Sequence, residues 1–190
     1  MSYPLRVTLR ADSARVRARM LAAARARVDT GDLELPMNAV AKEAGVGVGT
    51  MYRHFATRQA LLEALAAPSL QELVLEAHAA AASPDAGAGL SALIRETLRR
   101  QLTDPALALV LASGDVECAD TRGLLGHLMT ASQEVLTRAR AQGAIRADLA
   151  PDDLRRLTCG IRYAVSSGSG EDATAALDRY LEILMRGLRP

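Results

Sequence analysis

The stretch AVAKEAGVGVGTMYRHFATRQALLEAL, residues 39–65, decides the fold of this chain. Its apolar residues recur every three or four positions, a spacing typical of helices, and glycines interrupt the pattern. We expect a short helix over 37–44, started by Pro36 and ended by Gly45, because glycine readily takes the left-handed conformation that closes a helix. A second short helix is expected over 48–55, after a connection of only a few residues.

Two short helices joined by a tight glycine turn are typical of a helix-turn-helix, whose second helix enters the major groove of DNA. A small core would fix their crossing angle, and the residues spaced to form it are Val40, Ala41, Val46, Met51 and Phe55. The exposed side of the second helix would then carry Val48, Gly49, Thr50, Tyr52, Arg53 and His54. The pattern therefore indicates a DNA-reading surface on the second helix.

The rest of the chain also predicts helices and no sheet. Ala, Leu, Arg and Glu dominate at helical spacing, whereas β-branched and aromatic residues never alternate over four positions. Pro68 either kinks the fourth helix or separates it from a following one. The other helices are expected at about 13–28, 58–65, 70–82, 90–102, 106–111, 124–140, 152–165 and 173–188, the first of them starting at Ser13.

We therefore predict an all-α protein of about nine helices. Residues 1–65 would form an N-terminal three-helix helix-turn-helix domain, with the motif at about 37–56, and residues 66–190 would form a larger helical domain. Residues 1–60 carry ten basic and five acidic groups, a balance of +5, which leaves thirteen basic and seventeen acidic groups, or −4, for residues 61–190. The helix-turn-helix thus lies in the basic end, which suits a polyanionic partner.

Composition and motifs exclude several other classes of protein. The 190 residues are 49% hydrophobic and 24% charged, which suits a folded globular chain. The longest apolar stretch, residues 106–112, is far shorter than the roughly 20 residues of a membrane span, so we expect a cytoplasmic protein without a membrane partner. Two cysteines and three histidines show no metal-ligand spacing, and no catalytic motif is present, so we expect no metal, no cofactor and no enzymatic activity.

Residues 39–65 resemble the helix-turn-helix signature of the tetracycline-repressor (TetR) family of bacterial regulators. The likeness extends over about residues 13–65. It rests on the turn Ala44-Gly45-Val46, on Gly49-Thr50, Tyr52 and His54-Phe55 in the second helix, and on the basic Arg58 that opens the next helix. Met37 and Gly47 depart from the pattern, in which Thr and Ser are common, and a glycine cap costs about a few tenths of a kcal/mol.

The resemblance implies which side chains touch DNA. Tyr52, His54 and Arg58 would hold phosphates, and Asn38 would also reach the duplex. The residues that would face base edges are Val48, Gly49, Thr50 and Arg53. The first two offer no hydrogen-bonding side chain, so base specificity is expected from Thr50 or Arg53, from a thymine-methyl contact by Val48, or from DNA shape.

For the remaining two thirds, the resemblance implies an effector pocket and a homodimer. The last two helices would pair with those of a second subunit in a four-helix bundle, through Leu154, Leu157, Ile161, Leu177, Tyr180, Leu181 and Leu184. One helix-turn-helix contacts only a half-site, which also favours a two-fold dimer. The ligand-binding residues stay unassigned, but the effector would be small and largely apolar, because Tyr163 and Tyr180 are the only aromatics after residue 60.

Two functions follow from these observations. The first is a dimeric DNA-binding transcriptional regulator, a repressor that a small apolar ligand releases from its double-stranded DNA operator. The alternative is a helical ligand-binding or interaction protein that lacks DNA-binding activity. Binding of a random duplex, measured against salt concentration, would separate the two.

Overall fold

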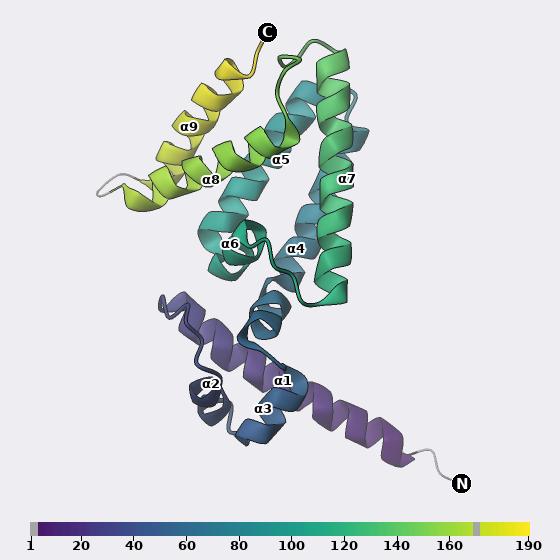
Figure 1. Ribbon diagram of the computed structural model, residues 1–190, viewed down its shortest axis with the longest axis vertical. Helices are drawn as coiled ribbons and strands as arrows, with labels where there is room; N and C mark the ends of the chain where they lie inside the picture. The colour runs from purple at the N-terminus through teal and green to yellow at the C-terminus, as the bar shows by residue number, and fades with distance from the viewer. Residues whose placement is uncertain (1–3, 169–171) are drawn as a thin grey trace.

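The computed structural model describes residues 4–168 and 172–190, and all the regular structure in these ranges is helical (Figure 1). The helices are α1 (Pro4–Asp29), α2 (Met37–Glu43), α3 (Val48–His54), α4 (Arg58–Ala82), α5 (Ala86–Thr103), α6 (Pro105–Ala112), α7 (Ala119–Ala141), α8 (Pro151–Ser167) and α9 (Ala173–Gly187). The prediction of an all-α protein of about nine helices is confirmed. Each helix in the described ranges is too short or too polar to span a lipid bilayer.

Helix α1 crosses one end of the molecule and supports the two short helices α2 and α3 (Figure 1). Met20, Ala24 and Val28 are buried, and their spacing of four residues places them on one face of the helix. The helix begins at Pro4, so the predicted start at Ser13 was wrong. The residues in between are rich in Leu, Arg and Ala, good helix formers that extend the helix past Ser13.

Helix α4 runs without interruption and carries the chain from one half of the molecule to the other (Figure 1). It therefore passes through the predicted domain boundary at residue 65 and through Pro68, which does not split it. Proline has no N–H with which to bond the preceding turn. In that turn the carbonyl oxygen of Leu65 accepts a hydrogen bond from Nη2 of Arg25, in α1, at 2.7 Å. Helix α1 thus supports α4 where the backbone hydrogen bonding of α4 is weakest.

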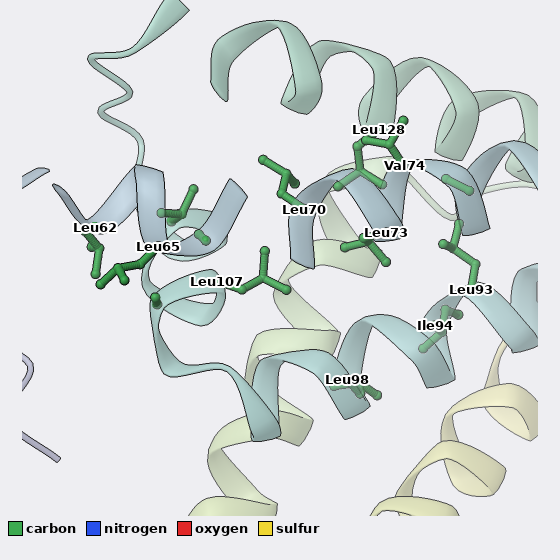
Figure 2. Packing of buried hydrophobic residues seen from close by; sticks show 14 of the residues in the cluster. Leu62, Leu65, Leu70, Leu73, Val74, Leu93, Ile94, Leu98, Leu107 and Leu128 are labelled. Carbon is green, nitrogen blue, oxygen red and sulfur yellow. The ribbon is translucent and has the colours of Figure 1, made fainter. Parts of the chain in front are cut away.

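Helices α4, α5, α6 and α7 form the main core (Figure 2). Helix α4 packs against each of the other three. The labelled buried side chains are Leu62, Leu65, Leu70, Leu73 and Val74 of α4, Leu93, Ile94 and Leu98 of α5, Leu107 of α6 and Leu128 of α7. Burying a side chain of this size stabilises a fold by about 1.5–3 kcal/mol. Helix α4 is therefore firmly embedded in the larger half, while its first turns belong to the helix-turn-helix end.

Two helices begin four and five residues earlier than the sequence predicts, because of the groups that cap them. Helix α5 starts at Ala86, since the Asp85 carboxylate accepts the backbone N–H of Ala88 at 2.8 Å. Helix α7 starts at Ala119, just after residues whose backbone N–H groups donate to Glu63 of α4. The last two helices, α8 and α9, pair with each other and pack against α5 (Figure 1).

Candidate nucleic-acid interface

The turn between α2 and α3 has the geometry that ends one helix and starts another within a few residues. Gly45 has φ +64°, the left-handed conformation that glycine adopts without a Cβ clash. The N–H of Gly45 donates to the carbonyl of Lys42 at 3.1 Å, and the N–H of Val46 donates to that of Ala41 at 2.9 Å. These two bonds close the C-terminus of α2. Gly47 then precedes α3 as its N-cap, without a side-chain capping bond.

A small apolar core holds α3 in place. Val40, Ala41 and Met51 are fully buried, Phe55 is nearly so, and Val46 is half-buried and packed against them. The predicted core of the motif is therefore confirmed. The guanidinium carbon of Arg17, in α1, lies 5.0 Å from the centre of the Phe55 ring, a cation–π contact that links α1 to the end of α3.

The outer side of α3 carries most of the residues predicted to read DNA. Val48 and Tyr52 are 44% and 47% exposed. Gly49 and Arg53 are also exposed on α3, Asn38 is exposed at the start of α2, and Thr50 and His54 are half-buried. A duplex docked on α3 would therefore meet a phenol, a guanidinium and, at Gly49, bare backbone.

Arg58, the remaining predicted contact, is used within the chain. Its Nε donates to the carbonyl of Glu34 at 2.7 Å, and its Nη2 donates to the carbonyl of Leu33. These bonds hold the loop before α2, in which Leu35 is fully buried at φ +46°, a strained conformation for leucine. Arg58 therefore stabilises this loop. Its contact with a DNA phosphate stays a prediction, and that contact would have to use the guanidinium N–H groups that the loop does not bind.

The cations around the motif divide into paired and unpaired groups. Arg25 and Arg27 of α1 form ion pairs with carboxylates. The exposed cations of the motif and of α1 that form no ion pair within the described part of the chain are Arg17, Arg19, Lys42 and Arg53. Arg19 lies beside the Gly45 turn. Of these four, only Arg53 was predicted to contact DNA. The others were not, because a basic residue on a helix gives the same sequence pattern whether it faces solvent or a phosphate.

A buried carboxylate joins the helix-turn-helix end to the larger half. Glu63 of α4 is fully buried, and its oxygens accept the backbone N–H groups of Glu117 and Cys118 at 2.9 Å each. The side-chain amide of Gln59 also donates to it, at 3.0 Å. Burial raises the pKa of Glu63, but these hydrogen bonds outweigh burial and leave the pKa below its ordinary value. Glu63 is therefore ionised at neutral pH and holds the electropositive N-terminus of α7.

A second carboxylate has the same function at the start of α6. Asp104 accepts the backbone N–H groups of Ala106 at 3.1 Å and Leu107 at 3.3 Å. It also accepts Nη1 of Arg25 at 2.8 Å and the hydroxyl of Ser69 at 2.6 Å. Burial raises the pKa of Asp104, but the bonds from Ser69 and Arg25 outweigh it, so the net shift is downward. Because Arg25 belongs to α1, this carboxylate also connects the two halves.

A cavity of about 420 Å³ lies between α5, α7 and α8. All of its lining residues fall within 90–159, and none of them is aromatic. Most of the wall is leucine, isoleucine and methionine, and Thr97, Gln101 and Ser132 are among its few polar groups. The volume falls in the range of sites for small molecules.

The residues predicted for a dimer divide between the core and the surface of the chain. Leu177, Leu181 and Leu184 are buried within the single chain, Leu154, Ile161 and Tyr180 are half-buried, and Leu157 is 42% exposed. Tyr163 and Ile183, which were not predicted, are 70% and 60% exposed. Among the described side chains of α8 and α9, the large apolar ones that are exposed are therefore Leu157, Tyr163 and Ile183.

Family comparisons agree with this arrangement. Residues 20–65 match the bacterial regulatory proteins of the tetR family, and residues 85–190 match the C-terminal domain of SbtR-like transcriptional regulators. The chain belongs to the TetR family of transcriptional regulators, and its helix-turn-helix is the DNA-binding part. The resemblance seen in residues 39–65 is thereby confirmed.

Solved structures of regulators share the fold. The TetR transcriptional regulator SCO0520 from Streptomyces coelicolor is 31% identical, with a TM-score of 0.57 over 92% of this chain and 98% of its own. A TetR regulatory protein from Mycobacterium vanbaalenii is 29% identical, with a TM-score of 0.51 over 96% and 99%. The regulator FadR from Bacillus subtilis, solved with stearoyl-CoA, is 20% identical, with a TM-score of 0.64 over 90% and 99%. None of the curated proteins compared matches the chain.

Proposed function

We propose that this TetR-family regulator is a cytoplasmic homodimeric repressor. It reads a two-half-site operator with α3 and leaves it when a small, mainly apolar molecule fills the cavity between α5, α7 and α8. The observation that carries the proposal is the outer side of α3, where Tyr52 and Arg53 are exposed beside unpaired cations of α1 and α2. The proposal includes no enzymatic activity, no metal and no cofactor.

The proposed DNA contacts divide into two kinds. Tyr52, His54 and three of the unpaired cations, Arg17, Arg19 and Lys42, hold phosphates, and Arg58 adds the N–H groups that the loop leaves free. Thr50, Arg53 and Val48 face base edges, and Gly49 lets the backbone come close. If Arg17, Arg19 and Lys42 each neutralise one phosphate, the logarithm of affinity should fall with the logarithm of salt concentration with a slope of about −2.7 per subunit.

The dimer follows from two observations. One helix-turn-helix reads a single half-site, and two copies of α3 one DNA turn apart, roughly 34 Å, read both. The exposed Leu157, Tyr163 and Ile183 supply apolar surface on α8 and α9 for the contact between subunits. Leu177, Leu181 and Leu184 support this interface from beneath, by holding α9 against the rest of the chain.

Release of DNA needs a route from the cavity to α3. Helix α7 lines the cavity with residues that include Leu128 and Ser132, and the residues at its start are bonded to Glu63. Glu63 lies in the first turns of α4, close in sequence to Arg58, which holds the loop before α2. A ligand that favours one position of α7 therefore shifts the balance between subunit arrangements, provided that it binds them unequally.

Selection of bound duplexes from a random-sequence pool, followed by fluorescence anisotropy at several salt concentrations, tests the proposal. We expect inverted half-sites and an affinity that falls steeply with salt. Arg53→Ala should relax the preference at the base it reads, by about 1–3 kcal/mol. Arg189→Ala, which removes the same charge from an exposed position at the other end of the chain, is the matched control and should leave affinity unchanged.

One outcome would contradict DNA reading altogether. If the protein binds no duplex at low salt, the alternative holds, and the chain is a helical ligand-binding or interaction protein without DNA-binding activity. If it binds duplexes without base preference, and Thr50→Ala and Arg53→Ala change nothing, α3 is not the reading helix.

A further inference from the structure

One polar side chain that lines the cavity between α5, α7 and α8 has no hydrogen-bond partner in the described part of the chain. Gln101 of α5 is 6% exposed and lines the cavity. Its side-chain amide makes no hydrogen bond to the part of the chain that the structure describes. The amide is not among the fully buried polar atoms that lack a partner, so it faces the open space of the cavity. A molecule that occupies the cavity can therefore hydrogen-bond to it.

The threonines that line the cavity have fewer free hydrogen-bonding groups for an occupant than Gln101 has. Thr97 and Thr158 each donate the hydroxyl hydrogen to a carbonyl of their own helix, at 2.7 Å and 2.8 Å. Ser132 of α7 is half-buried and makes no side-chain hydrogen bond within the described residues. Gln101 keeps two N–H donors and one carbonyl acceptor, which makes it the main polar group for an occupant.

The rest of the wall is aliphatic. Leu90, Leu93 and Ile94 of α5 and Leu125, Leu128 and Leu136 of α7 line it, and three of these are labelled in Figure 2. At about 30 Å³ for a group the size of a water molecule, a cavity of about 420 Å³ holds on the order of 14 such groups. With no aromatic side chain on the wall, a flat ring would find nothing to stack on.

The charges on the wall cancel each other. Asp152 and Arg155, the two charged residues that line the cavity, pair with each other at 2.8 Å. Arg156 also pairs with Asp152, at 2.7 Å. Both side chains of the Asp152–Arg155 pair are about half exposed, so this pair is a weak, solvated one at the edge of the cavity. The remaining lining residues carry no charge, so a charged head group buried among them would lack a counter-ion.

We infer that the effector is a neutral aliphatic molecule with a carbonyl or hydroxyl group that hydrogen-bonds to the Gln101 amide. The inference rests on the proposed function, which assigns this cavity to the effector. Binding itself can be measured without DNA, so the ligand class and the release mechanism are tested separately.

Calorimetric titration of the full-length protein with 2-undecanone, undecane and undecanoate at neutral pH tests the ligand class. We expect the ketone to bind about five- to tenfold tighter than the hydrocarbon, the effect of one hydrogen bond, and tighter than the carboxylate. Gln101→Leu, and Gln101→Met as a second variant, should bring the ketone and the hydrocarbon within about twofold of each other. Gln133→Leu changes an exposed glutamine of α7 and should keep the preference for the ketone.

The unfolding temperature of the free protein gives a second readout. Gln101→Leu should raise it, because leucine adds apolar contacts to an aliphatic wall and replaces an amide that has no partner in the described part of the chain. The inference is overturned if undecanoate binds tighter than the ketone, if the preference for the ketone survives both Gln101 substitutions, or if the ketone does not bind up to its solubility limit. Operator affinity at saturating 2-undecanone is a separate measurement. If operator affinity is unchanged while binding of the ketone depends on Gln101, the proposed release of DNA is wrong and the inferred ligand class is still supported.

Discussion

Replacing Glu63 by glutamine tests how the two halves of the chain are joined. A glutamine side chain has nearly the same shape, but it offers one acceptor oxygen and an NH₂ group that donates. The N–H groups of Glu117 and Cys118 are each directed at a different carboxylate oxygen, at 2.9 Å. In the Glu63→Gln variant one of them therefore faces a donor and loses its partner.

We expect this substitution to lower the free energy of unfolding by about 1.5–4 kcal/mol. An N–H that points at the fully buried Glu63 side chain and loses its acceptor costs about 1–3 kcal/mol. The lost negative charge at the N-terminus of α7 contributes about a further 0.3–1 kcal/mol.

Urea unfolding followed by circular dichroism measures the loss. Protein concentration is held fixed, because the stability of an oligomer depends on it. Glu76→Gln is the matched control: it makes the same change at an exposed position of α4 and should stay within about 0.5 kcal/mol of the unchanged protein.

The pH dependence is an independent check. The pKa of Glu63 in the folded chain lies below its ordinary value of 4.5, so the unfolded chain binds this proton more readily. The stabilisation is therefore fully present well above pH 4.5 and is lost as the pH falls through the folded pKa. The difference between the unchanged protein and Glu63→Gln should be constant near neutral pH and should shrink in acid. If Glu63→Gln is as stable as Glu76→Gln at pH 7, the carboxylate does not hold α7 in the way described.

Three further substitutions test other parts of the structure. Gly49→Ala, which places a methyl group in open space, should stabilise the free protein by about 0.5–1 kcal/mol in thermal unfolding while weakening operator binding; unchanged binding would remove Gly49 from the DNA contact. Asp104→Ala removes the carboxylate partner of Arg25, which keeps its bond to Leu65, and uncaps α6, so urea unfolding should show a loss of about 1–3 kcal/mol, and a loss under about 0.5 kcal/mol would contradict the argument. Leu157→Glu should give monomers in light scattering, whereas the same change at Leu75, 69% exposed on α4, should not; a dimeric Leu157→Glu variant would place the interface elsewhere.

Local spacing was enough to predict the helix-turn-helix. The Gly45 turn, the buried Met51 and Phe55 and the exposed Tyr52 all lie within a dozen residues, so their positions depend on helical periodicity and on glycine conformation alone. These features could be read before any contact between distant residues was known.

Contacts between distant residues could not be predicted in this way. Glu63 and Cys118 are 55 positions apart, and nothing in either residue type marks the other as its partner. Arg58 has the residue type of a phosphate ligand, but it bonds to backbone carbonyls, which every residue carries. The leucines of α9 have the spacing of an interface, and the same spacing serves burial within the chain. An apolar stripe therefore predicts that a helix face will be buried. It does not show whether that face packs within the chain or against a second subunit.

The two carboxylates that join the halves define which parts of this protein can be exchanged with another regulator. A chimera cut at residue 65 would keep Glu63 and Arg25 but replace Asp104 and the chain around Cys118, so each would meet a foreign partner. A new operator specificity is therefore better introduced by replacing the outer residues of α3 alone. In that design the larger half and both of its attachments are inherited intact.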